Sequence, residues 1–74
     1  VVVKKDSYLE NKNLIQAQIP KKTGLIVLAI KKIEDGKMIF NPPVDYQFKI
    51  GDILIVLGKE EQVDKLRHLG DEIK

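Results

Sequence analysis

Two runs of consecutive apolar residues, Leu25–Ile30 and Ile53–Leu57, constrain the fold of this chain more than any other feature of its sequence. Both runs are short and rich in β-branched residues, which is typical of central β-strands. Unlike an amphipathic edge strand, each run is apolar on both faces, so both faces need cover from water.

The chain has limited means of providing that cover. It contains 74 residues, and domains of this size bury only a little more than about 60% of the surface of the unfolded chain. Such domains commonly rely on disulfides, a metal or a partner chain. The sequence has no cysteine and a single histidine, which excludes disulfides and argues against a structural zinc. A partner chain is the remaining source of cover.

The N-terminal third predicts one strand and one helix. Val1–Val3 is expected to end a first strand, and residues 14–19 to form a short helix. We expect Pro20 to end this helix, because the residue before a proline is pushed out of helical geometry. Residues 21–24 are then expected to form a loop.

The central part predicts antiparallel strands joined by turns. Asp35-Gly36 favours a tight hairpin turn that returns as a short strand at Met38–Phe40. The step Asn41-Pro42-Pro43 stops that strand, because proline cannot donate a ladder hydrogen bond. Strand-forming residues on both sides of Gly51 favour a second hairpin, with the turn at Gly51-Asp52.

The last segment predicts a helix that begins near Glu60 and Glu61, whose carboxylates suit the positive end of the helix dipole. Gly70 is expected to end this helix. Its predicted apolar stripe consists of Val63, Leu66, Leu69 and Ile73.

These elements predict a small α+β domain of order β-α-β-β-β-α, with a mostly antiparallel sheet and two short helices on one face. The opposite sheet face would consist of alternate residues of the two apolar runs. A contiguous apolar patch left exposed usually marks an interface. The sequence therefore predicts a homodimer packed through that face or its edge.

Composition argues against two classes of function, nucleic-acid binding and membrane insertion. The net charge is +2, the basic and acidic residues are interspersed, and Arg67 is the only arginine, so a nucleic-acid surface is not expected. No apolar run approaches the ~20 residues that span a bilayer, so we expect no membrane insertion. The absence of cysteine fits a cytoplasmic setting. Because the chain opens at Val1 without a leader pattern, residues 1–74 are expected to be one domain of a larger protein.

Residues 23–66 carry a resemblance to a known family. The order of features is a Thr23-Gly24 step before an apolar strand that ends at Lys31, the Asn41-Pro42-Pro43 step, the Asp45-Tyr46-x-Phe48 segment, and Gly51-Asp52 leading through an apolar strand to Gly58. The chain resembles the C-terminal lobe of the RCK (regulator of potassium conductance) family, also called the TrkA C-terminal domain. The aspartate-aromatic segment is most similar to that of ligand-gated prokaryotic potassium channels.

The resemblance implies a cytoplasmic regulatory lobe of a potassium channel or potassium transporter at the inner membrane. It implies a homodimer, an N-terminal RCK lobe and a pore or transporter subunit as partners, and, in some members, cyclic di-AMP bound between two lobes. No GxGxxG motif of an N-terminal lobe occurs in these residues. Two alternatives stay open: a purely structural dimerisation module without a ligand, and the regulatory lobe of a cation/proton antiporter.

The resemblance also implies candidate ligand residues at a strand end and at the proline step. A lysine could pair with a phosphate, and an asparagine amide could donate a hydrogen bond. The competing interpretation is that the lysines are solvated and that Asn41 caps a turn. The candidate residues for a cyclic dinucleotide are Ile30, Lys31, Lys32, Phe40, Asn41 and Pro42.

Metal and catalytic sites are not expected. Calcium needs several converging oxygen ligands, and the nearest acidic cluster, Glu34-Asp35 with Asp45, has no such spacing. His68 is the only imidazole base, and no sequence pattern pairs it with Ser7. We therefore expect a chain that is not an enzyme, has no cofactor, and uses Tyr46 and Phe48 for packing.

Overall fold

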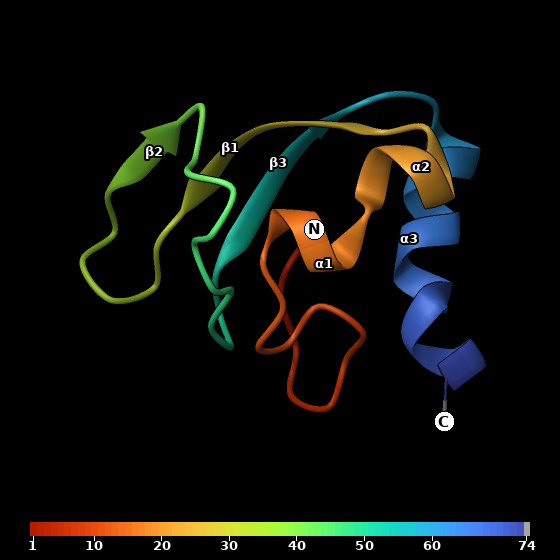
Figure 1. Ribbon diagram of the computed structural model, residues 1–74, viewed down its shortest axis with the longest axis horizontal. Helices are drawn as coiled ribbons and strands as arrows, with labels where there is room; N and C mark the ends of the chain where they lie inside the picture. Colours follow the sequence, from red (N-terminus) through yellow and green to blue (C-terminus); the bar gives the residue numbers. More distant parts are fainter. Residues whose placement is uncertain (74) are drawn as a thin grey trace.

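The computed structural model describes the backbone of residues 1–73 and the side chains of residues 1–69. Its elements follow the chain as helix, helix, three strands and helix (Figure 1). They are α1 (Leu14–Ala17), α2 (Ile19–Thr23), β1 (Ile26–Lys31), β2 (Met38–Phe40), β3 (Ile53–Leu57) and α3 (Glu60–Ile73).

The three strands form one antiparallel sheet in the order β2-β1-β3. The predicted strands at Met38–Phe40 and Ile53–Leu57 are confirmed, and the predicted strand Leu25–Ile30 is shifted by one residue to Ile26–Lys31. The register of β1 against β3 shifts between Val27 and Ala29, which is a β-bulge. β1 is therefore the central strand, with a neighbour on each side.

The first predicted turn is confirmed. Gly36 has a φ of +71°, and the Asp35 carboxylate accepts a hydrogen bond of 2.9 Å from the Lys37 backbone N–H. The second predicted hairpin is wrong, because residues 44–50 form no strand. The backbone N–H of Phe48 donates instead to the Lys12 carbonyl, at 2.8 Å, which ties this segment to the N-terminal part of the chain.

The predicted first strand is also wrong as a member of the sheet. Residues 1–3 make one isolated bridge, between Val2 and Ile53. Val3 donates its N–H to the Asp52 carbonyl and accepts from Gly51, both at 2.8 Å. The predicted order β-α-β-β-β-α is therefore replaced by α-α-β-β-β-α, with a short N-terminal segment beside β3.

Pro20 begins a helix rather than ending one. Asn13 and Gln16 form a capping box on α1, and Gln18, with a φ of +50°, separates α1 from α2. Pro20 lies in the first turn of α2. The N–H groups of a first turn have no partner within the helix, so a proline there costs no hydrogen bond. Most of the predicted loop 21–24 is therefore helical, and Gly24 caps it with a φ of +83°.

The C-terminal helix begins as predicted, with Glu60 and Glu61 in its first turn. Leu66 and Leu69 of its predicted apolar stripe are buried. The expected end at Gly70 is wrong, because α3 continues to Ile73. A glycine inside a helix costs about 1 kcal/mol relative to alanine without breaking the helix. The predicted role of the Ile73 side chain lies outside the described residues.

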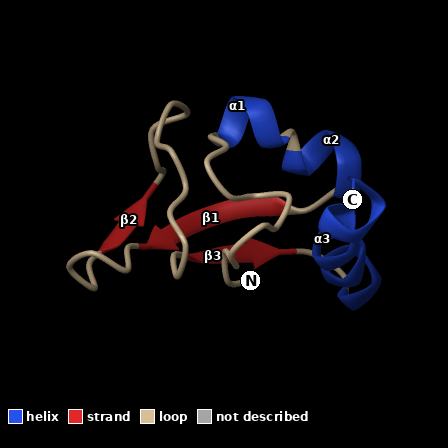
Figure 2. Cartoon of the chain, turned by 90° about the horizontal axis from the view of Figure 1, so that it is seen from below, coloured by secondary structure: helices blue, strands red, loops and turns tan. Residues whose placement is uncertain are grey.

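Only one face of the sheet is covered by the described helices. Figure 2 shows α1 and α2 on one side of β1 and β3, with α3 at the end of the sheet. Three helical segments thus replace the two that were predicted. The core lies between this covered face and the helices, and it includes Val3, Leu9, Ala17, Ile19, Leu25, Ile30, Phe48, Leu54, Leu66 and Leu69.

Candidate functional site

The register of the sheet separates the predicted ligand residues onto two faces. Ala29 pairs with Phe40, and Lys31 pairs with Met38, so Lys31 and Phe40 point to the same, uncovered face. Ile30 points to the opposite face, where its side chain is fully buried. Lys31 and Phe40 are therefore exposed on one face of the sheet, whereas the Ile30 side chain is not accessible there.

The proline step lies directly after β2. Asn41 is exposed and has a left-handed backbone with a φ of +49°, a conformation that asparagine tolerates better than most residues. The next residue, Pro42, is buried. The Asn41 amide thus remains accessible at the edge of the sheet, and Pro42 fixes the chain behind it.

The Lys32 ammonium is less accessible to a ligand than that of Lys31. Its ammonium lies 3.7 Å from the Asp35 carboxylate, and its side chain is only 25% exposed. Its backbone N–H donates to the Lys37 carbonyl at 2.9 Å, which closes the β1–β2 turn. Because β1 and β2 are antiparallel, Lys32 and Asn41 lie at opposite ends of β2.

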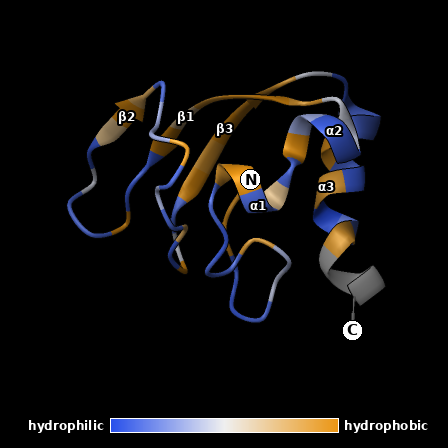
Figure 3. Cartoon of the chain, in the orientation of Figure 1, coloured by the Kyte–Doolittle hydropathy of each residue, from blue (hydrophilic) through white to orange (hydrophobic). Residues whose placement is uncertain are grey.

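The uncovered side of the sheet is a continuous apolar surface, here called the open face. Figure 3 shows β1 and β3 as hydrophobic along nearly their whole length. On the open face, the exposed fraction is 74% for Phe40, 58% for Leu57 and 56% for Ile26. An exposed patch of this kind marks an interface in most soluble domains. The open face consists of Ile26, Leu28, Met38, Phe40, Ile55 and Leu57.

A buried carboxylate that the sequence interpretation missed lies directly before β3. Asp52 is fully buried, and its carboxylate accepts one hydrogen bond from the residue after the β1 end and two from the loop before β3. The Ile33 N–H donates at 2.9 Å, the Lys49 N–H at 2.9 Å and the Tyr46 hydroxyl at 2.7 Å. We call these four residues the Asp52 clasp. Three donors offset the cost of burying this charge.

The sequence held one signal for the clasp. Gly51 has a φ of +95°, and a side chain there would meet Ile33 within 3 Å, so the Gly-Asp pair holds the end of β1 closely. An ion pair of 2.9 Å between Lys49 and Glu34 adds a second tie on the surface. Tyr46 and Phe48 pack against each other with their ring centres 6.4 Å apart, which agrees with the packing role predicted for them.

The Tyr46 hydroxyl gives the domain a testable alkaline pH dependence. Burial, reinforced by the hydrogen bond to Asp52, raises the pKa of Tyr46 above its ordinary value. The folded chain then holds this proton more tightly than the unfolded chain, so its stability falls as the pH rises through the unfolded pKa of about 10. Comparing urea midpoints at about pH 9 and about pH 11, we expect a larger drop for the wild-type chain than for Tyr46→Phe. Equal drops would contradict the assignment, because the two proteins differ only in the Tyr46 hydroxyl.

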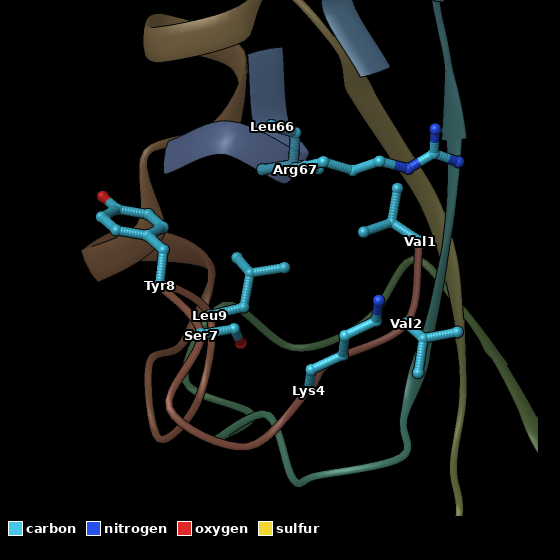
Figure 4. A pocket seen from close by; sticks show the side chains of 8 residues that line it. All are labelled: Val1, Val2, Lys4, Ser7, Tyr8, Leu9, Leu66 and Arg67. Carbon is cyan, nitrogen blue, oxygen red and sulfur yellow. The ribbon is translucent and has the colours of Figure 1, made fainter. Parts of the chain in front are cut away.

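A hollow of about 450 Å³ lies away from the candidate residues. Figure 4 shows Ser7 and Lys4 rising from the N-terminal loop toward it and Arg67 running past Val1. The Ser7 hydroxyl is buried and has no hydrogen-bond partner among the described residues. Arg67 is 63% exposed and pairs with Asp64 at 3.4 Å, so its charge stays in solvent. The lining residues are Val1, Val2, Lys4, Ser7, Tyr8, Leu9, Leu66 and Arg67.

The acidic residues near the β1–β2 turn face lysines. Glu34 pairs with Lys49, and this ammonium lowers the pKa of the Glu34 carboxyl. The Asp35 carboxylate accepts a hydrogen bond from the Lys37 N–H and faces the Lys32 ammonium, and both lower the pKa of this carboxyl. Within the part of the chain with described side chains, no three His, Asp or Glu residues gather closely enough to hold a metal ion.

A family model described as the TrkA-C domain matches residues 1–69. The chain belongs to the TrkA-C domain family. This confirms the resemblance seen in the sequence, and the TrkA-C family is a regulatory one without enzymatic activity, as expected.

Among curated proteins, this TrkA-C chain is similar to "Potassium channel protein 1" of Methanocaldococcus jannaschii. The two are 43% identical over 63 residues, which cover 85% of this chain and 18% of that protein. The TrkA-C chain thus spans about a fifth of the length of this relative.

Solved structures share the TrkA-C fold at low sequence identity. The "RCK_C domain dimer of S.agalactiae BusR in complex with c-di-AMP" has a TM-score of 0.81 at 22% identity, covering 97% of this chain and 92% of that chain. The RCK C domain of the potassium transport protein KtrA, in complex with cyclic diadenosine monophosphate, has a TM-score of 0.79 at 22% identity, covering 90% and 74%. No helix among the described residues is long and apolar enough to cross a membrane.

Proposed function

We propose that this TrkA-C chain is a cytoplasmic regulatory lobe of a potassium channel or potassium transporter, and that it works as a homodimer that binds cyclic di-AMP. The observation that carries the proposal is the open face, an apolar sheet surface that the described helices leave uncovered. A second copy of the chain is the occupant that fits best, because identical apolar faces are self-complementary about a twofold axis. The dimeric state of the BusR domain of similar fold supports this choice.

The ligand is assigned to the β2 edge of the open face. Phe40 offers an exposed aromatic ring on which an adenine can stack, and Lys31 and Asn41 offer donors for phosphate oxygens. The cyclic di-AMP bound in the BusR and KtrA structures supports this ligand class. Ile30, Lys32 and Pro42 would shape the site from behind through their backbone and packing.

Regulation would follow from differential binding. A ligand held between two lobes favours the arrangement of subunits that it binds more tightly, and it shifts that equilibrium by no more than its difference in affinity. An N-terminal RCK lobe and a pore or transporter subunit would carry the shift to the transport pathway. The similarity to a potassium channel protein favours a channel over an antiporter.

Calorimetry with cyclic di-AMP tests the ligand assignment. We expect one ligand to bind per two chains, and we expect Phe40→Ala and Lys31→Gln each to weaken binding by about tenfold, about 1.4 kcal/mol, because each removes a direct contact. Lys21→Gln is the matched control, since Lys21 is an exposed lysine on α2, away from the open face.

One observation favours the alternative of a structural dimerisation module. Lys32 is engaged by Asp35, so the site has fewer free cations than its sequence indicates. If calorimetry at about 1 mM cyclic di-AMP gives no heat while the chain remains dimeric, this alternative is the correct one.

A further inference from the structure

The Asp52 clasp connects the two flanks of the candidate ligand site. On one flank, the Ile33 N–H that donates to Asp52 belongs to the residue directly after Lys32. On the other flank, the Tyr46 hydroxyl donates to the same carboxylate. The Tyr46 backbone N–H in turn donates to the carbonyl of Pro43, the residue directly after Pro42, at 3.1 Å. Three hydrogen bonds therefore join the end of β1 to the segment that follows β2.

The β1–β2 ladder pairs Lys31 with Met38 and Ala29 with Phe40, but the Asn41–Pro42 flank lies just beyond the end of that ladder. Lys32 and Asn41 lie at opposite ends of the three-residue strand β2, and residues 41–52 contain no helix or strand. Ordering such a segment when a ligand binds costs conformational entropy, and ordering it beforehand removes that cost. The Asp52 carboxylate is fully buried and makes its hydrogen bonds within the chain, so it does not compete with the ligand for the exposed Lys31 and Asn41.

We propose that Asp52 and Tyr46 are positioning residues, which hold the Lys31–Lys32 flank and the Asn41–Pro42 flank of the ligand site in one fixed arrangement. The role rests on the proposed binding of cyclic di-AMP. Neither residue touches the ligand. Asp52 joins the flanks through its two carboxylate oxygens, and Tyr46 completes the connection through its hydroxyl and its backbone N–H.

Tyr46→Phe isolates this role better than a change at Asp52. It removes one hydroxyl group and keeps the aromatic ring that packs against Phe48. The chain also offers a matched control. Tyr8→Phe deletes a hydroxyl that donates a buried hydrogen bond of 3.0 Å to the Ala17 carbonyl, in the helical part of the domain. Both variants lose one tyrosine hydroxyl and one hydrogen bond, but only Tyr46→Phe opens the clasp.

The experiment combines calorimetry with amide chemical shifts, at a temperature where all variants are folded. We expect Tyr46→Phe to bind cyclic di-AMP about tenfold more weakly than the wild-type chain, and Tyr8→Phe to bind it within about twofold. Without ligand, we expect Tyr46→Phe to move the amide resonances of Lys32, Ile33 and Asn41, and Tyr8→Phe to leave them in place.

The outcomes separate the two proposals. Unchanged affinity in Tyr46→Phe, or equal weakening in Tyr8→Phe, would overturn the positioning role while leaving the ligand site intact. Unmoved resonances of Ile33 and Asn41 in Tyr46→Phe would overturn the connection between the flanks. If the wild-type chain binds no cyclic di-AMP, the proposed ligand is wrong and the positioning role in binding is overturned with it. In that case the amide resonances of Ile33 and Asn41, measured without ligand, still test whether Tyr46 connects the two flanks.

Discussion

Replacing Ile26 by lysine and Leu57 by aspartate together is expected to convert the dimer into a folded monomer. These two exposed residues are directly paired across β1 and β3 on the open face. In a dimer packed through that face, both charges would be taken from water and the burial of two large apolar side chains would be lost. We expect the dissociation constant of the dimer to rise at least about 100-fold, which corresponds to about 2.7 kcal/mol.

The double variant is chosen so that the fold of the single chain loses little stability. Opposite charges at directly paired positions attract each other across an antiparallel sheet, by about 0.2–1 kcal/mol. Sedimentation velocity at micromolar concentration measures the oligomeric state, and far-UV circular dichroism reports whether the sheet is intact.

The control for this pair is Ile15→Asp. Ile15 is 63% exposed but lies on α1, which covers the other side of the sheet. The Ile15→Asp variant should remain a dimer. A folded double variant that remains a dimer would refute the assignment of the interface to the open face, as would a wild-type chain that sediments as a stable monomer.

Replacing Asp52 by asparagine is expected to cost about 3 kcal/mol of the free energy of unfolding. The carboxylate accepts from Ile33, Lys49 and Tyr46, and an amide has only one oxygen to offer these donors. Its NH₂ group would face a donor in a fully buried position. A 74-residue chain has a total stability of about 4–11 kcal/mol, so this loss would remove a large share of it.

Urea unfolding at neutral pH, followed by circular dichroism, measures this loss. Asp45→Asn makes the same chemical change at an exposed aspartate seven residues earlier and should shift stability by less than about 0.5 kcal/mol. If Asp52→Asn unfolds at the wild-type urea concentration, the clasp is not the tie between the segments that its geometry indicates.

Strands and turns with a strong local signal could be predicted from the sequence. The apolar run Ile53–Leu57 forms β3 with the predicted bounds, and Asp35-Gly36 turns the chain as expected, because both depend on neighbours in the sequence. The uncovered sheet face could also be predicted, since it follows from counting the elements available to cover two apolar strands. Lys31 and Phe40 proved to share that face.

The errors arise where tertiary context overrides local preference. Local preference predicts that Pro20 ends a helix, but the left-handed Gln18 already breaks the helix two residues earlier, so Pro20 can lie in the first turn of the next one. The residues on both sides of Gly51 favour a hairpin in the sequence, but the backbone N–H groups of Phe48 and Lys49 donate to the N-terminal segment and to the Asp52 carboxylate instead. The clasp itself joins Ile33 to Asp52 across 19 positions, a distance over which sequence spacing carries no signal.

The N-terminal segment also gives the domain a mechanical property. The Leu54 N–H donates to the Val1 carbonyl at 2.7 Å, the Val1 ammonium donates to the Leu54 carbonyl at 2.9 Å, and Val2 bridges Ile53 in antiparallel direction. Tension applied along residues 1–3 therefore acts in shear and stretches these bonds together instead of peeling them apart singly. The strand that receives the force also carries Ile55 and Leu57. Force applied to the first residues is therefore transmitted through β3 to the open face.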